Sequence, residues 1–387
     1  DIYDLLLFAI IRIPSLQSLG LSKSQIASDG QWILNMQMIG LLIGGVLWGI
    51  LGDKKGRMKV LFASIIIYSL GNIANGFVHT VAQYGTVRFF TGIGLAGELG
   101  AGITLVTEIL PKEKRGIATS FVAAVGLLGA VVAFLIKEQF SNWRICYYVG
   151  GGLGFLLLLL RVSVHESGMF RHIENADISR GNFLMLFTNG RRFRKYLTAI
   201  LVGLPTWYVI GILIAFSNEF AAKMNMHGSV DPGKAIMISY AIISAGGVLT
   251  GYVSKWLKSR KQALYIFYSI TAIGIVWFFN LQNAEASRMY MACAVLGFGV
   301  GFWSIFVTMA AEQFGTNIRA TVATTVPNMI RGSLVLITAL FNGLQAHSGY
   351  VTSGWITGIV TLVIGLAAVM LSEETYHKDL NYVEEFG

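Results

Sequence analysis

The residues best suited to chemistry are a few ionisable side chains inside long apolar stretches of the chain. They are Asp1, Asp4, Arg12, Arg88, Glu98 and Arg331. A charge within a bilayer is costly unless it has a partner, so each of these residues is a candidate functional residue. An arginine in such a place can hold a carboxylate through two parallel hydrogen bonds, and a desolvated carboxyl group can carry a proton. The pattern therefore indicates anion binding together with proton transfer.

The composition shows what kind of protein must position these residues. Of the 387 residues, 55% are hydrophobic and only 13% are charged, and the mean hydropathy is +0.64. A soluble chain has about 25% charged residues. Cys146 and Cys293, the two cysteines, lie in apolar runs and are interpreted as small core residues. The composition excludes a soluble enzyme, a disulfide-stabilised domain and a disordered chain, and it predicts a polytopic membrane protein.

Eleven apolar stretches are long enough to cross a bilayer, which takes about 20 residues. They are roughly 32–51, 59–77, 81–103, 117–136, 143–161, 196–216, 234–253, 262–280, 288–311, 320–344 and 353–371. Residues 2–13 are too short to span and the chain does not open with Met, so we expect a twelfth helix that has lost its beginning. This opening is not interpreted as a signal peptide, because it has no basic region and no cleavage pattern.

The net charge of +9 is explained by membrane topology and gives no reason to expect a nucleic-acid partner. Lys and Arg gather in alternate loops, which predicts that these loops, and both termini, face the cytoplasm. The one long polar connection divides the chain into a six-helix bundle at 1–161, a cytoplasmic linker at 162–195, a second bundle at 196–371 and a tail at 372–387. The linker is a plain connection or a regulatory and docking segment.

The loops of the first half recur in the second half, shifted by roughly 202–208 residues. Gly49–Lys59 corresponds to Gly251–Lys261, Glu108–Arg115 to Glu312–Arg319, and Glu166-Ser167 to Glu374-Thr375. Two six-helix halves related by a parallel repeat are one of the known plans of membrane transporters.

At these residues the chain resembles the major facilitator superfamily. The motif Gly49-Ile-Leu-Gly-Asp-Lys-Lys-Gly-Arg-Met-Lys59 is similar to the family's loop between its second and third helices. Asp1-Ile-Tyr-Asp4, together with Gly97-Glu98, looks most like the proton symporters of sialic acid and aromatic acids. The resemblance implies an all-α fold of 12 transmembrane helices in two halves related by pseudo-two-fold symmetry. One departure is Lys255, which stands where the first half has Asp53.

The resemblance also implies roles for the loop charges. Asp53 is expected to face the start of the eleventh helix and to hold the halves together when the cytoplasmic side is closed. The gate and hinge charges that exchange partners would be Arg57, Glu108, Arg115, Glu312 and Arg319. For Lys54, Lys55 and Lys59 we prefer the simpler interpretation that basic loop residues only determine topology.

Substrate binding is predicted to centre on Arg331, about a dozen residues into the eleventh span. It would bind a carboxylate, with Asn328 as a further substrate-binding candidate, or else be satisfied by a neighbouring acid or by Asn328 itself. Arg88 would hold Asp4 or a substrate carboxylate. Further candidates are aromatic side chains that line a pocket or only pack between helices: Trp207, Tyr208, Trp303 and Tyr240.

Proton transfer is predicted at Asp4 or Glu98. Asp1 lies three residues from Asp4 and is either a second carboxylate of the same site or a solvated group near the cytoplasmic mouth. Arg12 is expected to lie near the outer end of its helix and to snorkel.

Together these observations predict a proton-coupled symporter of a small organic anion, a carboxylate, that works by alternating access as a monomer in a bacterial inner membrane. We expect no cofactor beyond the proton gradient, and no phosphate-binding loop or metal-ligand cluster occurs in the sequence. The alternatives are a carrier of a sugar or an organic cation with structural arginines, and a ligand-binding receptor on a transporter fold. An enzyme is disfavoured because no nucleophile–base pair is evident.

Overall fold

The computed structural model describes residues 1–110, 112–160, 181–378 and 382–384, without the side chains of 107–108 and 112–117. Across these ranges the protein is built from helices, and its β-pairing is a single bridge between His227 and Glu285.

The first half contains the helices before the linker. They are α1 (Ile2–Ser18), α2 (Lys23–Lys55), α3 (Arg57–Asn75), α4 (Val81–Ile109), α5 (Lys112–Leu127), α6 (Gly129–Gln139) and α7 (Trp143–Leu160). A capping box of Ser22 and Gln25 begins α2, because it satisfies amide groups that the first helical turn leaves unpaired. Helices α2 and α4 cross closely, since a Cβ atom on Gly40 would lie 2.1 Å from the carbonyl oxygen of Phe89.

The second half contains the helices after the linker. They are α9 (Met185–Thr188), α10 (Gly190–Tyr208), the π-helix η1 (Val209–Ile214), α11 (Ser217–Lys223), α12 (Pro232–Leu257), α13 (Arg260–Phe279), α14 (Ala286–Gly299), the 3₁₀ turn η2 (Val300–Phe302), α15 (Trp303–Glu312), α16 (Arg319–Gly332), α17 (Leu334–Ser348) and α18 (Tyr350–Leu371). Asn189 begins α10 inside the range predicted as linker, because its side chain accepts from the amides of Arg191 and Arg192.

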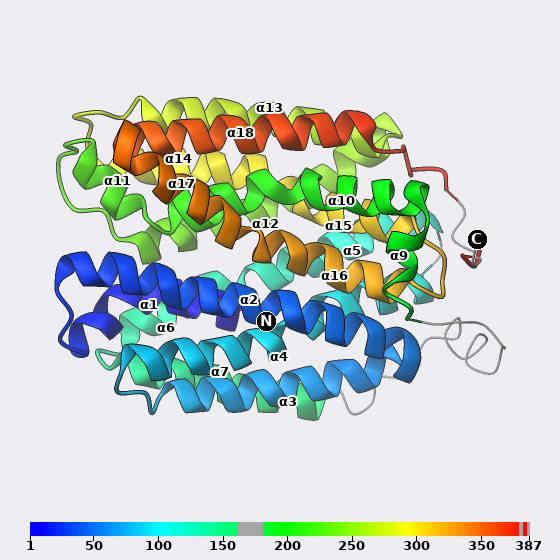
Figure 1. The fold of residues 1–387 in the computed structure, drawn as a ribbon, viewed down its shortest axis with the longest axis horizontal. Coiled ribbons are helices and arrows are strands. Elements are labelled where there is room, and N and C mark those ends of the chain that lie inside the picture. Colours follow the sequence, from blue (N-terminus) through cyan, green and yellow to red (C-terminus); the bar gives the residue numbers. More distant parts are fainter. Residues whose placement is uncertain (111, 161–180, 379–381, 385–387) are drawn as a thin grey trace.

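Among the described residues, 11 helical segments are long and apolar enough to cross a membrane, and they coincide with the predicted stretches. Several spans are composite: α5 continues into α6, α14 into α15 and α16 into α17. Helix α1 has 17 residues, and the N-terminus lies near the middle of the bundle (Figure 1).

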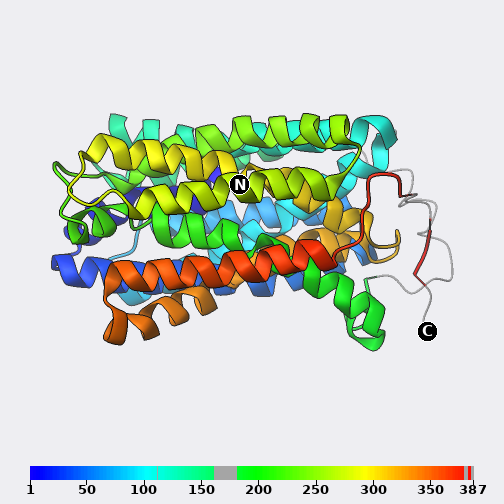
Figure 2. The ribbon, with the colours of Figure 1, turned by 90° about the horizontal axis from the view of Figure 1, so that it is seen from above.

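The helices run along one common direction, with the first half beside the second (Figures 1 and 2). The halves meet mainly through α2 against α16 and α5 against α12. We call the end where α2, α15 and α18 finish the linker end, and the opposite end, where α1 finishes, the far end. The interface between the halves is where a transporter of two repeats places its substrate.

Candidate functional site

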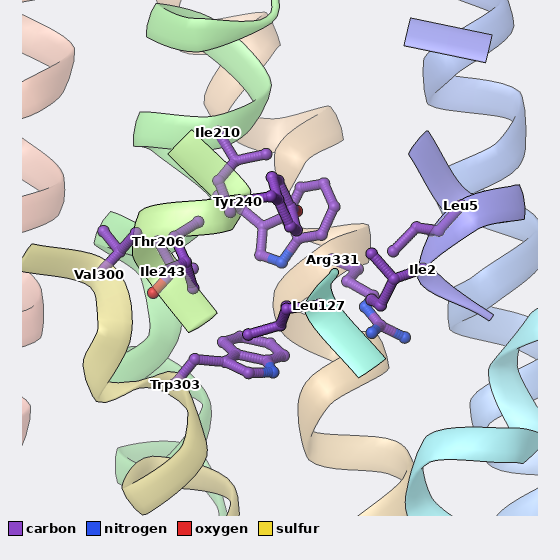
Figure 3. A pocket seen from close by; sticks show the side chains of 11 residues that line it. Ile2, Leu5, Leu127, Thr206, Ile210, Tyr240, Ile243, Val300, Trp303 and Arg331 are labelled. Atoms are coloured by element: carbon purple, nitrogen blue, oxygen red, sulfur yellow. The ribbon is translucent and has the colours of Figure 1, made fainter. Parts of the chain in front are cut away.

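A cavity lies between the two halves, about midway along the helices. The space free of protein atoms there, open solvent included, is about 310 Å³. Figure 3 shows the lining residues, which are Ile2, Leu5 and Leu127 from the first half and Thr206, Trp207, Ile210, Tyr240, Ile243, Val300, Trp303 and Arg331 from the second. Both halves therefore contribute to one site.

The helices that form the cavity are irregular where they reach it. Pro205 lies inside α10 just before the cavity residues Thr206 and Trp207, and the π-helix η1 follows directly. The 3₁₀ turn η2 interrupts the span that carries Val300 and Trp303. Such interruptions of α-helical hydrogen bonding mark functional sites and hinges more often than ordinary helix interiors do. The backbone thus supports the assignment of this cavity as the site.

Among the described residues that line the cavity, Arg331 is the only charged one. Its side chain is buried, Nη1 donates to Oδ1 of Asn328 at 3.0 Å, and Nε has no hydrogen-bond partner in the described part of the chain. The guanidinium lies 5.9 Å from the centre of the Trp303 ring. It has no acidic partner among the ion pairs of the described residues. A buried guanidinium without an acidic partner can still bind the carboxylate of a ligand.

Asn328 positions Arg331 and joins the two halves. Its Nδ2 donates to the backbone carbonyl of Ala96 in α4 at 2.8 Å and to that of Thr324 at 2.8 Å. Its Oδ1 faces Arg331. Asn328 was predicted to bind substrate, and the structure places it behind Arg331, where it can orient the guanidinium.

Two adjacent aromatic residues that were both predicted to line the pocket lie in different places. Trp207 lines the cavity with Trp303 and Tyr240. Tyr208 points toward α18, where its hydroxyl donates to the backbone carbonyl of Gly354 at 2.6 Å. Successive helical residues are about 100° apart around the axis, so Tyr208 is turned away from the face that Thr206 and Trp207 present to the cavity.

Arg88 lies inside the first half and is absent from the cavity lining. Its Nη2 donates to the backbone carbonyl of Asp4 at 2.9 Å, Nε to Oε1 of Gln37 at 3.2 Å and Nη1 to Oδ1 of Asn72 at 3.5 Å. The structure therefore does not bring Arg88 and Arg331 into one pocket. Arg88 instead ties α4 to α1, α2 and α3.

The candidate proton sites are buried near the start of α1. Asp4 is 4% exposed, and its Oδ1 has no hydrogen-bond partner in the described part of the chain. A Cβ atom on Gly150 would lie 2.5 Å from this oxygen, so α7 needs glycine there. Glu98 is also buried, 3.7 Å from the amino group of Asp1. None of the three acids lines the cavity, although Asp4 shares α1 with Ile2 and Leu5, which do.

At the linker end, Asp53 of the first half contacts the start of α16 in the second half. Its carboxylate accepts from the amide of Thr321 at 2.8 Å, from the Thr321 hydroxyl at 2.7 Å and from the amide of Ala320 at 3.3 Å. The N-cap residue of α16, Ile318, supplies no side-chain cap. Asp53 thus provides the negative charge and the acceptors that a helix N-terminus favours. Arg57 stands 3.5 Å from the same carboxylate.

The other predicted gate charges have different partners. Glu312 pairs with Arg260 at 3.0 Å and accepts from the Thr375 hydroxyl at 2.7 Å. Arg319 donates to the backbone carbonyl of Phe314 at 3.3 Å. The side chains of Glu108 and Arg115 lie outside the described residues. Arg260 is thus a further functional candidate, which the sequence indicated only as part of the repeated motif Gly251–Lys261.

The prediction that Arg12 snorkels is wrong. Its side chain is 3% exposed, forms an ion pair with Glu219 of α11 at 3.0 Å and lies 4.1 Å from the centre of the Phe216 ring. Lys137 of α6 pairs with Asp231 before α12 at 3.1 Å, also across the halves. The far end is therefore bridged by two charge pairs, whose acids were not recognised because each lies at the edge of an apolar span.

The sequence model of the Major Facilitator Superfamily matches residues 4–335. The chain belongs to this superfamily. It is a multi-pass membrane transporter and not an enzyme.

Several known proteins are similar to this transporter over nearly its whole length. The niacin transporter NiaP of Acinetobacter baylyi is 27% identical over 92% of this chain and 88% of its own length. The cis,cis-muconate transport protein of the same species is 24% identical over 88% of this chain and 84% of its own length. The solved structure of the proton:xylose symporter XylE has a TM-score of 0.73 at 18% identity and covers 98% of this chain and 94% of that chain. At that identity it shows the fold alone.

Proposed function

We propose that this transporter moves a small organic anion, a carboxylate, together with protons. Arg331 would bind the carboxylate at the cavity between the halves, and Asp4 or Glu98 would carry the proton. The linker end would face the cytoplasm of a bacterial inner membrane. Transport would need no cofactor beyond the proton gradient, and one chain would suffice.

The observation that carries this proposal is the unneutralised charge of Arg331. A buried guanidinium without a carboxylate partner is expensive, because it has lost water and gained little in return. A carboxylate ligand supplies the missing charge and can accept from Nε and a second nitrogen in parallel. An organic cation would meet the positive charge of Arg331 and no acidic residue among the described residues of the lining, so this arrangement disfavours a cation carrier.

The residues that line the cavity favour a planar monocarboxylate. Trp207, Trp303 and Tyr240 offer aromatic surfaces, and a single arginine balances a single negative charge. Niacin and muconate, the compounds in the names of two relatives, are both carboxylic acids. Niacin combines a flat ring with one carboxyl group and fits this pattern better than a dicarboxylate does.

Alternating access would work through the contacts at the two ends. Asp53 and α16 close the linker end, and Arg12 with Glu219 closes the far end. We therefore assign the arrangement with both ends bridged to an occluded state of the cycle. Opening one end at a time would expose Arg331 to one side of the membrane.

Uptake into proteoliposomes under an inward pH gradient tests the proposal. Arg331→Gln removes the charge, and we expect radiolabelled carboxylate uptake to fall at least 100-fold, because two charge-assisted hydrogen bonds are lost. Arg331→Lys should retain partial activity. Arg288→Gln, on an exposed arginine of α14, is the matched control and should leave uptake unchanged. Uptake that survives Arg331→Gln would contradict the anion site, and uptake that ignores the pH gradient would contradict proton coupling.

A further inference from the structure

A second recess lies at the linker end, entirely within the second half and its tail. It contains about 630 Å³ of empty space open to solvent. Its lining residues are Arg191, Arg194, Lys195, Thr198, Gln313, Leu371 and Glu373. Figure 2 shows that α18 finishes at the same end of the molecule as α9, which directly precedes α10. The recess is separate from the cavity between the halves, so the transport cycle described above does not account for it.

The recess carries more positive than negative charge. Arg191, Arg194 and Lys195 face a single lining carboxylate, Glu373. Glu373 lies 3.3 Å from Arg191 and 3.1 Å from Lys195, and it also pairs with Lys378 of the tail at 3.7 Å. One carboxylate thus serves three cations, and Arg194 has no ion pair among the described residues.

The titration of the tail residues reflects this excess of positive charge. Burial and the neighbouring charge of Lys195 lower the pKa of Lys378. Burial alone would raise the pKa of Glu373, but its contacts with Lys195, Arg191 and Lys378 hold that pKa below the ordinary value. The lowered pKa of Glu373 is the direction expected in a positive field, whereas for Lys378 burial is the larger cause and Lys195 the second.

Cations are also unfavourable at the start of α10. The N-terminal turn of a helix carries a partial positive charge, so Arg191, Arg194 and Lys195 add to it. Asn189 accepts from the first free amides but brings no charge. An anion seated in the recess would relieve this repulsion.

The recess lies at the level where a membrane surface would be. Gly190 begins one candidate span and Leu371 ends another, so the cations stand at the boundary of the apolar region. Apolar side chains exposed next to them include Phe193, Leu197 and Leu371. A ligand with a negative head and apolar tails would contact both kinds of surface at once.

We propose that this recess binds the phosphate headgroup of an anionic phospholipid. The phosphate would lie against Arg191, Arg194 and Lys195, and an acyl chain would run along Leu197 and Leu371. The basic loops of such a protein face the anionic leaflet, which supplies this lipid at high local concentration.

Gln313 indicates the kind of headgroup. It lines the recess, is 1% exposed, and its Oε1 has no hydrogen-bond partner in the described part of the chain. A headgroup hydroxyl can donate to this acceptor, so a glycerol headgroup fits better than one without hydroxyl groups. Gln313 directly follows Glu312, which pairs with Arg260, so a bound lipid would lie beside that charge pair.

Native mass spectrometry of the detergent-purified transporter with added lipid tests the proposal. We expect phosphatidylglycerol to bind and phosphatidylcholine to bind much more weakly. The triple variant Arg191→Gln/Arg194→Gln/Lys195→Gln should bind phosphatidylglycerol about 100-fold more weakly, because each basic residue near a charged headgroup contributes about five-fold and the variant removes three of them. The matched control Lys54→Gln/Lys55→Gln/Lys59→Gln removes three exposed cations from the same end of the first half and should leave binding unchanged.

Two results would overturn the lipid site. One is phosphatidylglycerol binding that the triple variant retains or that the control loses equally. The other is displacement of the lipid by millimolar inorganic phosphate, which would make the recess a site for free anions. If the triple variant does not elute as a folded monodisperse species, Arg194→Gln alone decides the matter, because its side chain is exposed and the expected loss is about five-fold.

Discussion

Removing the charge of Asp53 should open the linker end of the transporter. The carboxylate accepts three hydrogen bonds from α16, two from Thr321 and one from Ala320. These bonds join the two halves, so opening the linker end would break them. Asp53→Asn keeps the size of the side chain but leaves one acceptor oxygen and no charge for the helix N-terminus.

The size of the effect follows from which contacts differ between the closed and open states. A hydrogen bond to a buried charge contributes about 1.5–3 kcal/mol. The variant keeps one such acceptor in neutral form, so we expect the closed state to lose about 2–3 kcal/mol, or roughly 30- to 150-fold in the closed–open equilibrium. The ion pair between Asp53 and Arg57 lies within the first half and adds nothing to this shift, because it can persist in both states.

Electron–electron resonance between two spin labels measures this equilibrium. Lys59→Cys in α3 and Lys255→Cys in α12 place labels on exposed residues of opposite halves at the linker end, and the native Cys146 and Cys293 are buried and should not react. The parent should show a single short distance, and Asp53→Asn should add a longer one as the main population. Asp29→Asn, on the same helix but at the far end, is the control. Identical distance distributions in Asp53→Asn and the control would refute this reasoning.

Three further predictions concern the far end, the proton site and the cavity wall. Glu219→Gln leaves Arg12 buried without its ion pair, so labels at Lys23→Cys and Lys223→Cys should move apart, and an unchanged distance would show that the pair does not hold the far end. Gly150→Ala should destabilise the protein by about 1–3 kcal/mol, because the new methyl group meets Asp4 and Tyr3. The control is Gly152→Ala, whose methyl group meets nothing within 4 Å. Thermal unfolding compares the two variants, and equal midpoints would contradict the buried position of Asp4. Trp207→Ala should weaken ligand binding about ten-fold or more while Tyr208→Phe leaves it unchanged, which titration calorimetry can measure, and the reverse order would mean that α10 is rotated.

The transmembrane helices could be predicted from the sequence because the bilayer imposes their length and composition. The 11 apolar stretches coincide with the 11 candidate spans of the described residues, whereas the short helices α9 and α11 lie outside them. The sequence also located Arg331 and Asp53, because a lone cation inside a span and a lone acid among loop cations are conspicuous.

The faces of the helices could not be predicted in the same way. Hydropathy gives the ends of a span but not its rotation, so Trp207 and Tyr208 looked equivalent, and Arg88 looked as well placed for substrate as Arg331. In the structure the Arg88 guanidinium donates hydrogen bonds to Gln37, Asn72 and the backbone carbonyl of Asp4. Only the packing of four helices in the first half determines this.

Ion pairs between residues that are distant in the sequence could not be predicted either. Arg12 and Glu219 are 207 residues apart, and neither residue by itself reveals the other. The resemblance named Glu312 as a gate charge without giving its partner, and the structure pairs it with Arg260, which lies 52 residues away. The π-helix η1 also has no signature in the sequence, because it depends on how α10 packs around the cavity.

The central claim is that Arg331 binds a carboxylate, and matched ligand pairs test it most directly. Titration calorimetry of the purified transporter would compare an aromatic carboxylate with its neutral amide, such as niacin with nicotinamide, in the parent and in Arg331→Gln. The account predicts that the parent prefers the carboxylate by about 100-fold, because the amide cannot pair with the guanidinium charge, and that Arg331→Gln abolishes this preference. Equal binding of carboxylate and amide by the parent, or an undiminished preference in Arg331→Gln, would contradict it.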